Sequence, residues 1–171
     1  MSEVEVSVAR PRDRRALANL TQLYIHDFSE FWAGTPDGEL RDDGRFADYP
    51  LDAYWRELSR IPLLFRKDDR LIGFALLNAF GHGEWPVERN MAEFFIVRKH
   101  RRGGVGTAAA RQVFSLYPGR WEVAVARKNI AALGFWRQAI GGHLHVREVE
   151  ELDLATPAWN GPLFRFAVAS A

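Results

Sequence analysis

The stretch "FFIVRKHRRGGVG", residues 94–106, joins an apolar run to a basic, glycine-rich loop. The apolar run belongs to a strand predicted over 91–97, and the spacing of apolar residues predicts a helix over 106–117. The glycines at 103, 104 and 106 therefore lie between a strand end and a helix start. Because glycine has no side chain, an anion can reach the unpaired backbone N–H groups of the first helical turn. The loop therefore predicts a phosphate site, with added positive charge from Arg98, Lys99, Arg101 and Arg102.

Three other interpretations of this loop compete with that one. A tight turn with solvated arginines is the simplest of them. A Walker loop is excluded, because Thr107 follows Gly106 with no lysine between them. A dinucleotide fold fits poorly, although 104–109 match G-x-G-x-x-A, because the residues 98–103 separate the strand from the first glycine. The position of the acidic ribose-binding residue is also taken by Arg127 or Lys128.

The same stretch resembles the core motif of the GNAT acetyltransferase superfamily, in which Arg/Gln-x-x-Gly-x-Gly/Ala opens a helix after a strand. Arg101, Gly104 and Gly106 occupy the signature positions. A second segment, "NIAALGFWRQAIGG" at 129–142, resembles the family's Asn-x-x-Ala-x-x-Phe-Tyr block. The resemblance covers about residues 91–142, and "AEFF" with "FWR" is similar to an uncharacterised branch of predicted acetyltransferases.

The resemblance implies one α/β domain over 1–171, with a mixed sheet of about seven strands and about four helices. Alternation predicts a first strand over 4–10, and periodicity predicts helices over 12–31 and around 51–60. Two strands within 61–80 form a hairpin at Asp68–Asp69, and late strands are predicted over 144–150 and 163–169. In the family, the strand 91–97 and its neighbour at 121–127 splay apart, and the pantetheine arm of acetyl-CoA lies in the gap.

Acetyl-CoA is thus the implied co-substrate. Backbone groups near Ile96, Val97 and Arg98 would bind its pantetheine arm. Its pyrophosphate would be held, beside Arg101, by the backbone N–H groups of Arg102, Gly103, Gly104, Val105, Gly106 and Thr107. Asn129 would bind the pantetheine, cap a helix, or do both. Trp136 would pack against the cofactor arm or the core.

Acetyl transfer to an amine requires a base and a proton for the leaving thiolate. Glu93 is the predicted base, because it interrupts an apolar strand; a salt-bridged structural glutamate is the alternative. Trp136 occupies the position where the family usually has an acidic tyrosine, and an indole N–H is a far weaker acid. Another donor, departure of a free thiolate or loss of catalysis are the alternatives. The candidate donors are Tyr117, His143 and Tyr24.

The segment 24–57 is expected to wall the acceptor site, with Tyr24, Asp27, Phe28 and Phe31 as substrate-binding residues. Residues 27–57 hold nine acids against three arginines, a net charge of −6, so the remaining chain carries +7. This pattern favours a small cationic amine: an amino sugar, a polyamine or a basic amino-acid derivative. A CoA-binding regulator without activity and an NADP-dependent reductase are the alternatives of other classes.

Composition narrows the remaining classes. The chain has no cysteine, which excludes disulfides and thiolate sites and fits a reducing compartment, so a cytoplasmic location is expected. The apolar run at 71–80 is too short for a membrane span, and no signal peptide is evident. The isolated "RKHRR" run does not favour nucleic acid. His143 and His145 alternate along an expected edge strand without a third ligand, so no metal is expected. A homodimer is left open.

Overall fold

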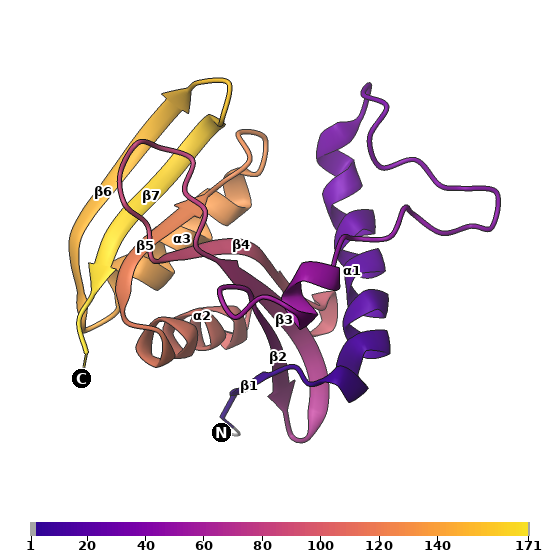
Figure 1. Ribbon diagram of the computed structural model, residues 1–171, viewed down its shortest axis with the longest axis horizontal. Helices are drawn as coiled ribbons and strands as arrows, with labels where there is room; N and C mark the ends of the chain where they lie inside the picture. Colours follow the sequence, from indigo (N-terminus) through magenta and orange to yellow (C-terminus); the bar gives the residue numbers. More distant parts are fainter. Residues whose placement is uncertain (1–2, 171) are drawn as a thin grey trace.

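The computed structural model describes residues 3–170 of the chain, which form a seven-stranded sheet with helices on both faces (Figure 1). The strands run in the order β1-β2-β3-β4-β5-β7-β6, and every neighbouring pair is antiparallel except β4 with β5. Their bounds are β1 Glu5–Val8, β2 Ile61–Lys67, β3 Arg70–Asn78, β4 Arg89–Ile96, β5 Gly119–Ala124, β6 Val146–Ala155 and β7 Asn160–Val168. The predicted mixed sheet of about seven strands is confirmed.

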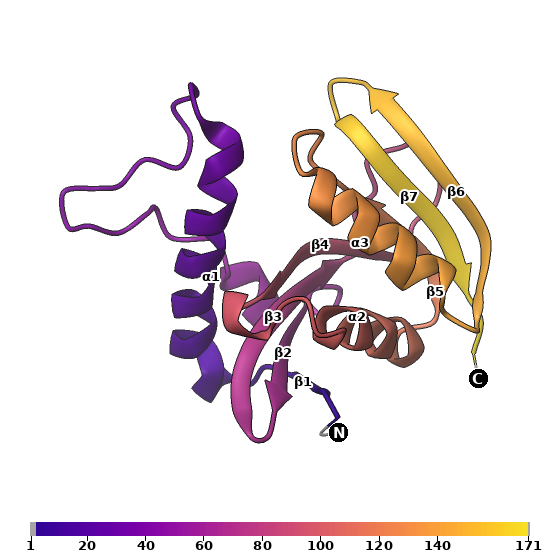
Figure 2. The same cartoon turned by 180° about the vertical axis from the view of Figure 1, so that it is seen from behind.

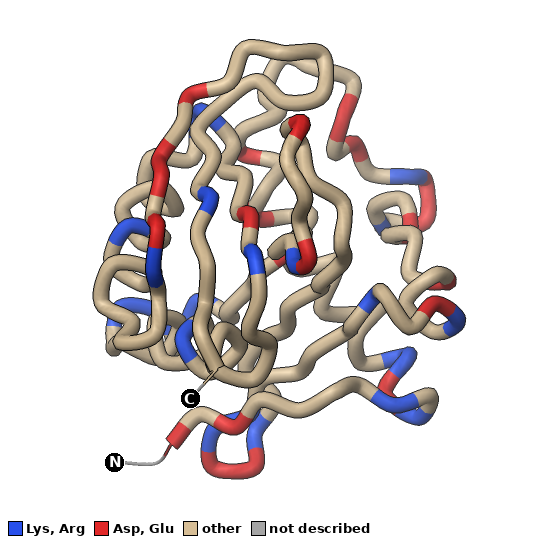
Figure 3. Tube along the Cα trace, turned by 60° about the vertical axis from the view of Figure 1, so that its left-hand side comes forward, with Lys and Arg blue, Asp and Glu red and all other residues tan. Residues whose placement is uncertain are grey.

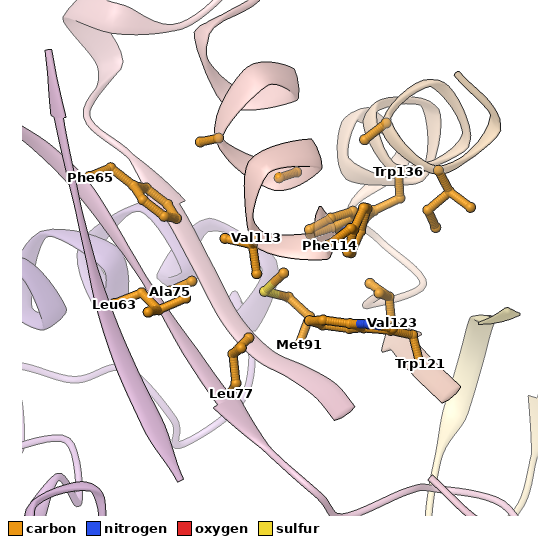
Figure 4. Packing of buried hydrophobic residues seen from close by; sticks show 14 of the residues in the cluster. Leu63, Phe65, Ala75, Leu77, Met91, Val113, Phe114, Trp121, Val123 and Trp136 are labelled. Carbon is orange, nitrogen blue, oxygen red and sulfur yellow. The ribbon is translucent and has the colours of Figure 1, made fainter. Parts of the chain in front are cut away.

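Side-chain alternation along the strands gives the sheet two buried faces. Helix α1, Arg14–Phe28, covers one face, where its Leu17 and Leu20 pack with Leu64 and Phe74. Helices α2, Val105–Leu116, and α3, Ile130–Gly141, lie side by side on the other face, as seen from behind in Figure 2. Figure 4 shows the second core, in which the strand side chains meet Val113 and Phe114 of α2 and Trp136 of α3. Within residues 3–170, no helix is long and apolar enough to cross a membrane.

The helix predicted around 51–60 is instead a 3₁₀ helix, Asp52–Trp55, so the fold has three α-helices rather than about four. The residues between this turn and Ile61, where β2 begins, are turns and irregular chain. Within its single turn, Tyr54 becomes buried in the core beneath α1. One turn is therefore enough to bury the aromatic side chain that made the pattern appear helical.

The predicted hairpin between β2 and β3 is confirmed. Asp68 and Asp69 have φ values of 51° and 61°, the left-handed conformation required at both central positions of a type I′ turn. The aspartates tolerate this conformation better than most residues. The turn sets the β2–β3 register, which places Phe74 and Leu76 beneath α1.

The parallel pair β4–β5 is joined at only two positions, Arg89 with Trp121 and Asn90 with Glu122. Beyond these positions β4 continues to pair with β3 as far as Ile96, while β5 pairs with β7. Strand β4 also contains a bulge, because its register with β3 shifts by one residue between Met91 and Glu93. The predicted splayed pair is therefore present, and the gap between the two strands opens the site.

Candidate functional site

A cleft of about 1520 Å³ lies where β4 and β5 diverge. It is bounded by α1, the glycine loop, the start of α3 and the loop between β3 and β4. The predicted site residues that line it are Tyr24, Asp27, Phe28, Phe31, Glu93, Ile96, Arg98, Arg101, Arg102, Gly104, Gly106, Thr107, Asn129 and Trp136. Val97, Gly103 and Val105 do not line it. Most of the residues singled out in the sequence thus lie together around one cavity.

The glycine loop leaves open space at the N-terminus of α2. Gly104 caps this helix with a φ of 76°, and Arg102 has a φ of 66°, both in the left-handed region. A Cβ atom at Gly103 or Gly104 would meet no heavy atom within 4 Å. The backbone N–H groups that begin α2 therefore face a space that an anion can enter, which fits the pyrophosphate of acetyl-CoA.

The arginines next to the loop differ in their partners. The guanidinium of Arg101 binds the Asp27 carboxylate on α1 and donates from Nε to the Ile96 carbonyl at 2.6 Å. Arg98 binds the same carboxylate at 2.8 Å. Within the described residues, Arg102 makes no side-chain ion pair or hydrogen bond and is exposed. Arg102 is therefore the arginine most available to a phosphate.

Asp27 is committed to this ion pair. Partial burial raises the pKa of its carboxyl group, but the two guanidinium groups outweigh that effect and hold the pKa below its usual value. A carboxylate with a lowered pKa is a poor base, and one with two cationic partners attracts a cationic acceptor weakly. Asp27 thus links α1 to the glycine loop.

Two of the backbone groups expected to bind pantetheine already have partners. The Val97 N–H donates to the Ile72 carbonyl at 2.9 Å, and the Ile96 carbonyl accepts from Arg101. Asn129 caps α3, because its Oδ1 accepts from the Ala132 N–H at 3.1 Å. The remaining free groups on the inner edges of β4 and β5 are the ones left for the cofactor arm.

Trp136 is a packing residue that also reaches the wall of the cleft. It is 6% exposed, and its ring lies 5.2 Å from the ring of Phe94 and 4.8 Å from that of Phe135. Edge-to-face aromatic contacts of this kind stabilise a core. Its burial agrees with packing against the core, one of its two predicted contacts, and packing against the cofactor arm stays a prediction.

Glu93 lies on β4 directly after the bulge, half-buried, with both carboxylate oxygens hydrogen-bonded. The Tyr49 hydroxyl donates to Oε1 at 2.7 Å, and the Tyr24 hydroxyl donates to Oε2. Burial raises the pKa of Glu93, and the two hydroxyl groups only partly oppose this. Burial and the neighbouring carboxylate also raise the pKa of each tyrosine, so both remain protonated donors. The partnership of Tyr49 was not predicted, because 44 residues separate it from Glu93.

A buried carboxylate that contacts the lining of the cleft was missed. Glu122 on β5 is fully buried, and its Oε1 accepts from the backbone N–H of His82 at 2.6 Å and lies 2.7 Å from Nδ1 of the same histidine. His82 lines the cleft and lies beside Trp159, with 5.0 Å between the ring centres. The sequence did carry an indication, since Glu122 interrupts the apolar strand "WEVAVAR" just as Glu93 interrupts its own strand.

Two of the candidate acids lie outside the cleft. Tyr117 contacts the guanidinium of Arg89, and the ring of His143 is hydrogen-bonded to Ser115 at 2.9 Å. His143 and His145 occupy the turn before β6 rather than the expected edge strand, because that strand begins only at Val146. Among residues 3–170, no three His, Asp or Glu side chains are placed to hold a metal ion.

The acidic segment faces the cleft less than expected. Asp27 and Glu30 are its only acids that line the cavity, among the described residues. The loop after α1 extends away from β6 and β7, on the far side of α1 (Figure 1). Figure 3 shows basic positions interspersed among its acidic ones, and Asp43 and Asp48 pair with Arg41 and Arg45. Most of the −6 charge is therefore solvated or locally neutralised.

The profile of the acetyltransferase (GNAT) family matches residues 17–141. The chain belongs to this family. It is therefore a CoA-dependent N-acetyltransferase, with acetyl-CoA as its co-substrate. No curated protein sequence matches it.

Solved structures of GNAT proteins share its fold at low sequence identity. Aminoglycoside acetyltransferase AAC(6′)-Ib, in complex with coenzyme A and kanamycin, is 16% identical with a TM-score of 0.63, over 97% of this chain and 95% of that one. An acetyltransferase from Thermus thermophilus is 15% identical with a TM-score of 0.62, over 98% and 97%. Spermidine N-acetyltransferase from Vibrio cholerae, in complex with coenzyme A and spermine, is 12% identical with a TM-score of 0.58, over 97% and 95%. At these identities the likeness concerns the fold.

Proposed function

We propose that this GNAT protein transfers the acetyl group of acetyl-CoA to the primary amine of a small cationic acceptor, with Glu93 as general base. The observation that carries the proposal is the half-buried Glu93 carboxylate, which lies in the cleft with two tyrosine hydroxyl groups on it. Residues 91–142 form the cofactor-binding core, and residues 24–57 supply the acceptor side.

The cofactor half of the cleft fits acetyl-CoA. The open space at Gly103 and Gly104 admits the pyrophosphate, the N–H groups from Arg102 to Thr107 hold it, and the unpaired Arg102 adds charge. The gap between β4 and β5 receives the pantetheine arm as an added strand. When bound, acetyl-CoA supplies an acyl carbon activated as a thioester.

The residues of the chain manage protons and charge. Glu93 removes a proton from the attacking nitrogen, directly or through one water, and burial raises its pKa, which makes it a stronger base than an exposed glutamate. A backbone N–H at the β4 bulge stabilises the negative charge that develops on the carbonyl oxygen. Tyr24 and Tyr49 hold the carboxylate in place. Trp136 has no hydroxyl to give the leaving sulfur, so the proton reaches it from another group.

The acceptor side favours a cation for two reasons. The rings of Phe31 and Trp32 each lie 5.3 Å from the ring of Phe28, and aromatic faces attract ammonium groups. Glu30 also lines the cleft and is exposed. The structural neighbours were solved with spermine and with kanamycin, both polycationic amines, which supports the same class of acceptor here.

The test combines binding with turnover. Acetyl-CoA, but not NADPH, should raise the melting temperature of the protein, because only a bound ligand shifts the folding equilibrium. Spermidine and kanamycin should each be tested for acetylation by mass spectrometry. Stabilisation by NADPH alone would indicate a reductase instead. Tight binding of acetyl-CoA without acetylation of any amine in a broad panel would indicate a CoA-binding regulator.

A further inference from the structure

His82 lines the cleft and pairs with the buried Glu122, and the proposed reaction does not use this ionisable pair. Glu122 belongs to the last residue pair that joins β4 to β5, opposite Asn90. Glu93 follows Asn90 by three positions on β4, which corresponds to roughly 10 Å along the strand. His82 and Glu93 therefore line the same cleft, beside the point where the two strands diverge.

The contacts of Glu122 engage one ring nitrogen of His82 and leave the other without a partner. Oε1 of Glu122 accepts from the His82 backbone N–H at 2.6 Å and lies 2.7 Å from Nδ1. An ionised Glu122 can only accept at this distance, which assigns the ring proton to Nδ1. Within residues 3–170, Nε2 has no hydrogen-bond partner, and His82 lines the cleft. A buried carboxylate that holds one nitrogen of an imidazole leaves the other nitrogen free to accept a proton, the arrangement used by histidine bases.

The chemistry requires two protons to leave the acceptor nitrogen. A primary ammonium ion becomes a secondary amide as the C–N bond forms and the C–S bond breaks. The nitrogen loses one proton before it attacks and a second one as the amide forms. One of these protons ends on the sulfur of coenzyme A, and the other is released to water.

We propose that His82 is a second catalytic residue, which takes the first proton from the acceptor ammonium on Nε2 and releases it to water. The inference rests on the proposed acetyl transfer. Glu93 then takes the second proton as the amide forms and returns it toward the sulfur. Glu122 is a positioning residue, which holds the His82 ring through Nδ1.

His82 and Glu93 differ in how readily each can pass a proton to solvent. The His82 side chain is 28% exposed, so it can exchange its proton with solvent, whereas Glu122 behind it is fully buried. The Glu93 carboxylate is occupied on both oxygens by tyrosine hydroxyl groups and is suited to keep a proton within the cleft. The histidine is thus the better route to water.

The other charged groups near this pair are directed elsewhere. Arg165 is the cross-strand partner of Glu122, but its guanidinium pairs with Glu150 at 3.0 Å and lies over the ring of Trp85. Arg89 donates to the Glu88 carbonyl and contacts Tyr117. Among the described residues, Glu122 is the charged group that contacts His82. Oε2 of Glu122 is buried without a hydrogen-bond partner, so the polar contacts of this side chain are those of Oε1 with His82.

The test uses His82→Asn, because the asparagine amide can replace Nδ1–H as the donor to Glu122 while it offers no base. We expect kcat/KM for spermidine or kanamycin, whichever is acetylated faster, to fall roughly a hundredfold at neutral pH. The loss should shrink as the pH rises toward the pKa of the acceptor amine, because the acceptor then arrives already neutral. Glu122→Gln should show a smaller loss with the same pH dependence.

The matched control is His143→Asn. His143 is a half-buried histidine outside the cleft, so this variant should retain full activity.

Several outcomes overturn the inference. A loss in His82→Asn that is equal at every pH would indicate a packing role for His82, and an unchanged rate would indicate no role. A ¹⁵N NMR spectrum at alkaline pH that shows the proton of the His82 ring on Nε2 would also refute it, without any need for turnover. Calorimetry with acetyl-CoA separates failure of the inference about His82 from failure of the proposed function. A wild type that neither binds acetyl-CoA nor acetylates an amine overturns the proposed function and this inference together, whereas a fully active His82→Asn overturns the inference alone.

Discussion

The two halves of the cleft are built in different ways. The cofactor half comes from one nearly continuous stretch, β4 with the glycine loop and the start of α2, joined by the start of α3. The acceptor half joins side chains from five separate segments, namely Tyr24, Tyr49, His82, Glu93 and Glu122. The first half depends on backbone conformation, which a short sequence motif encodes. The second depends on contacts between residues 40 or more positions apart, such as His82 with Glu122.

The largest expected effect tests the cofactor half. Gly104→Val should abolish acetyl-CoA binding, because a branched side chain would occupy the open space at the N-terminus of α2 and block approach to the backbone. In the wild type, added salt should weaken binding, since exposed Arg102 meets the phosphates. Isothermal titration calorimetry with acetyl-CoA measures both effects.

Gly44→Val is the matched control for this change. Gly44 has the same φ of 76°, a Cβ atom there would also meet nothing within 4 Å, and it lies in the loop outside the cleft. Both variants carry the same backbone strain, so their melting temperatures should fall alike, whereas only Gly104→Val should lose the ligand. Normal binding by a folded Gly104→Val would show that the loop does not hold the phosphates.

The next effect tests the acceptor half. Glu93→Gln should reduce kcat by roughly a hundredfold or more, the usual scale for loss of a general base, while acetyl-CoA affinity stays largely intact. Glutamine can still accept from Tyr24 and Tyr49 through its amide oxygen, so the fold should be preserved. Steady-state kinetics beside acetyl-CoA calorimetry would separate chemistry from binding. An unchanged turnover number would exclude Glu93 as the base. His82 would then be the remaining candidate for that role.

The sequence predicted the cofactor half because its determinants are local. Glycine spacing between a strand and a helix sets the backbone of the loop, and the resemblance of 91–142 placed the splayed strands correctly.

The acceptor half was predicted only in part. Glu93 stood out as a charge in an apolar strand, and Tyr24 was placed on its wall. However, neither the bond from Tyr49 nor the His82–Glu122 pair follows from spacing, since tertiary folding brings these residues together. The charge of the acidic loop was a poor guide to the site, because composition does not show which way a loop extends.

A smaller effect concerns the pH dependence of the rate. Burial raises the pKa of Glu93, so the acid limb of the pH–rate profile should lie above the usual glutamate value. The Tyr49 hydroxyl stabilises the ionised carboxylate and thereby lowers that pKa. Tyr49→Phe should therefore raise it and shift the acid limb to higher pH by about one unit or more, because a hydrogen bond to a charged group contributes about 1.5–3 kcal/mol.

Tyr117→Phe is the control for this shift, because Tyr117 lies outside the cleft and does not contact Glu93. Its acid limb should coincide with that of the wild type. A Tyr49→Phe profile that coincides with the wild type as well would mean that the acid limb belongs to another group, and His82 would be the first to examine.

The smallest effect on activity is expected at Trp136, which lines the cleft and packs in the core. Its ring packs against Phe94, Phe114 and Phe135, so Trp136→Phe should lower the free energy of unfolding by about 1–3 kcal/mol. Acetyl transfer should stay within a fewfold of the wild type, because the indole N–H supplies no proton to the sulfur. Thermal melts must precede the kinetics, since a partly unfolded sample would imitate a catalytic defect.

Trp136→Tyr then sharpens the comparison, because it places a hydroxyl near the family's usual position for the acid. If Glu93 already returns a proton to the sulfur, the added hydroxyl should bring no gain in rate. A clear gain would show that thiolate departure limits the wild type. A stable Trp136→Phe that binds acetyl-CoA but cannot transfer the acetyl group would contradict the packing role, since the indole would then position the thioester itself.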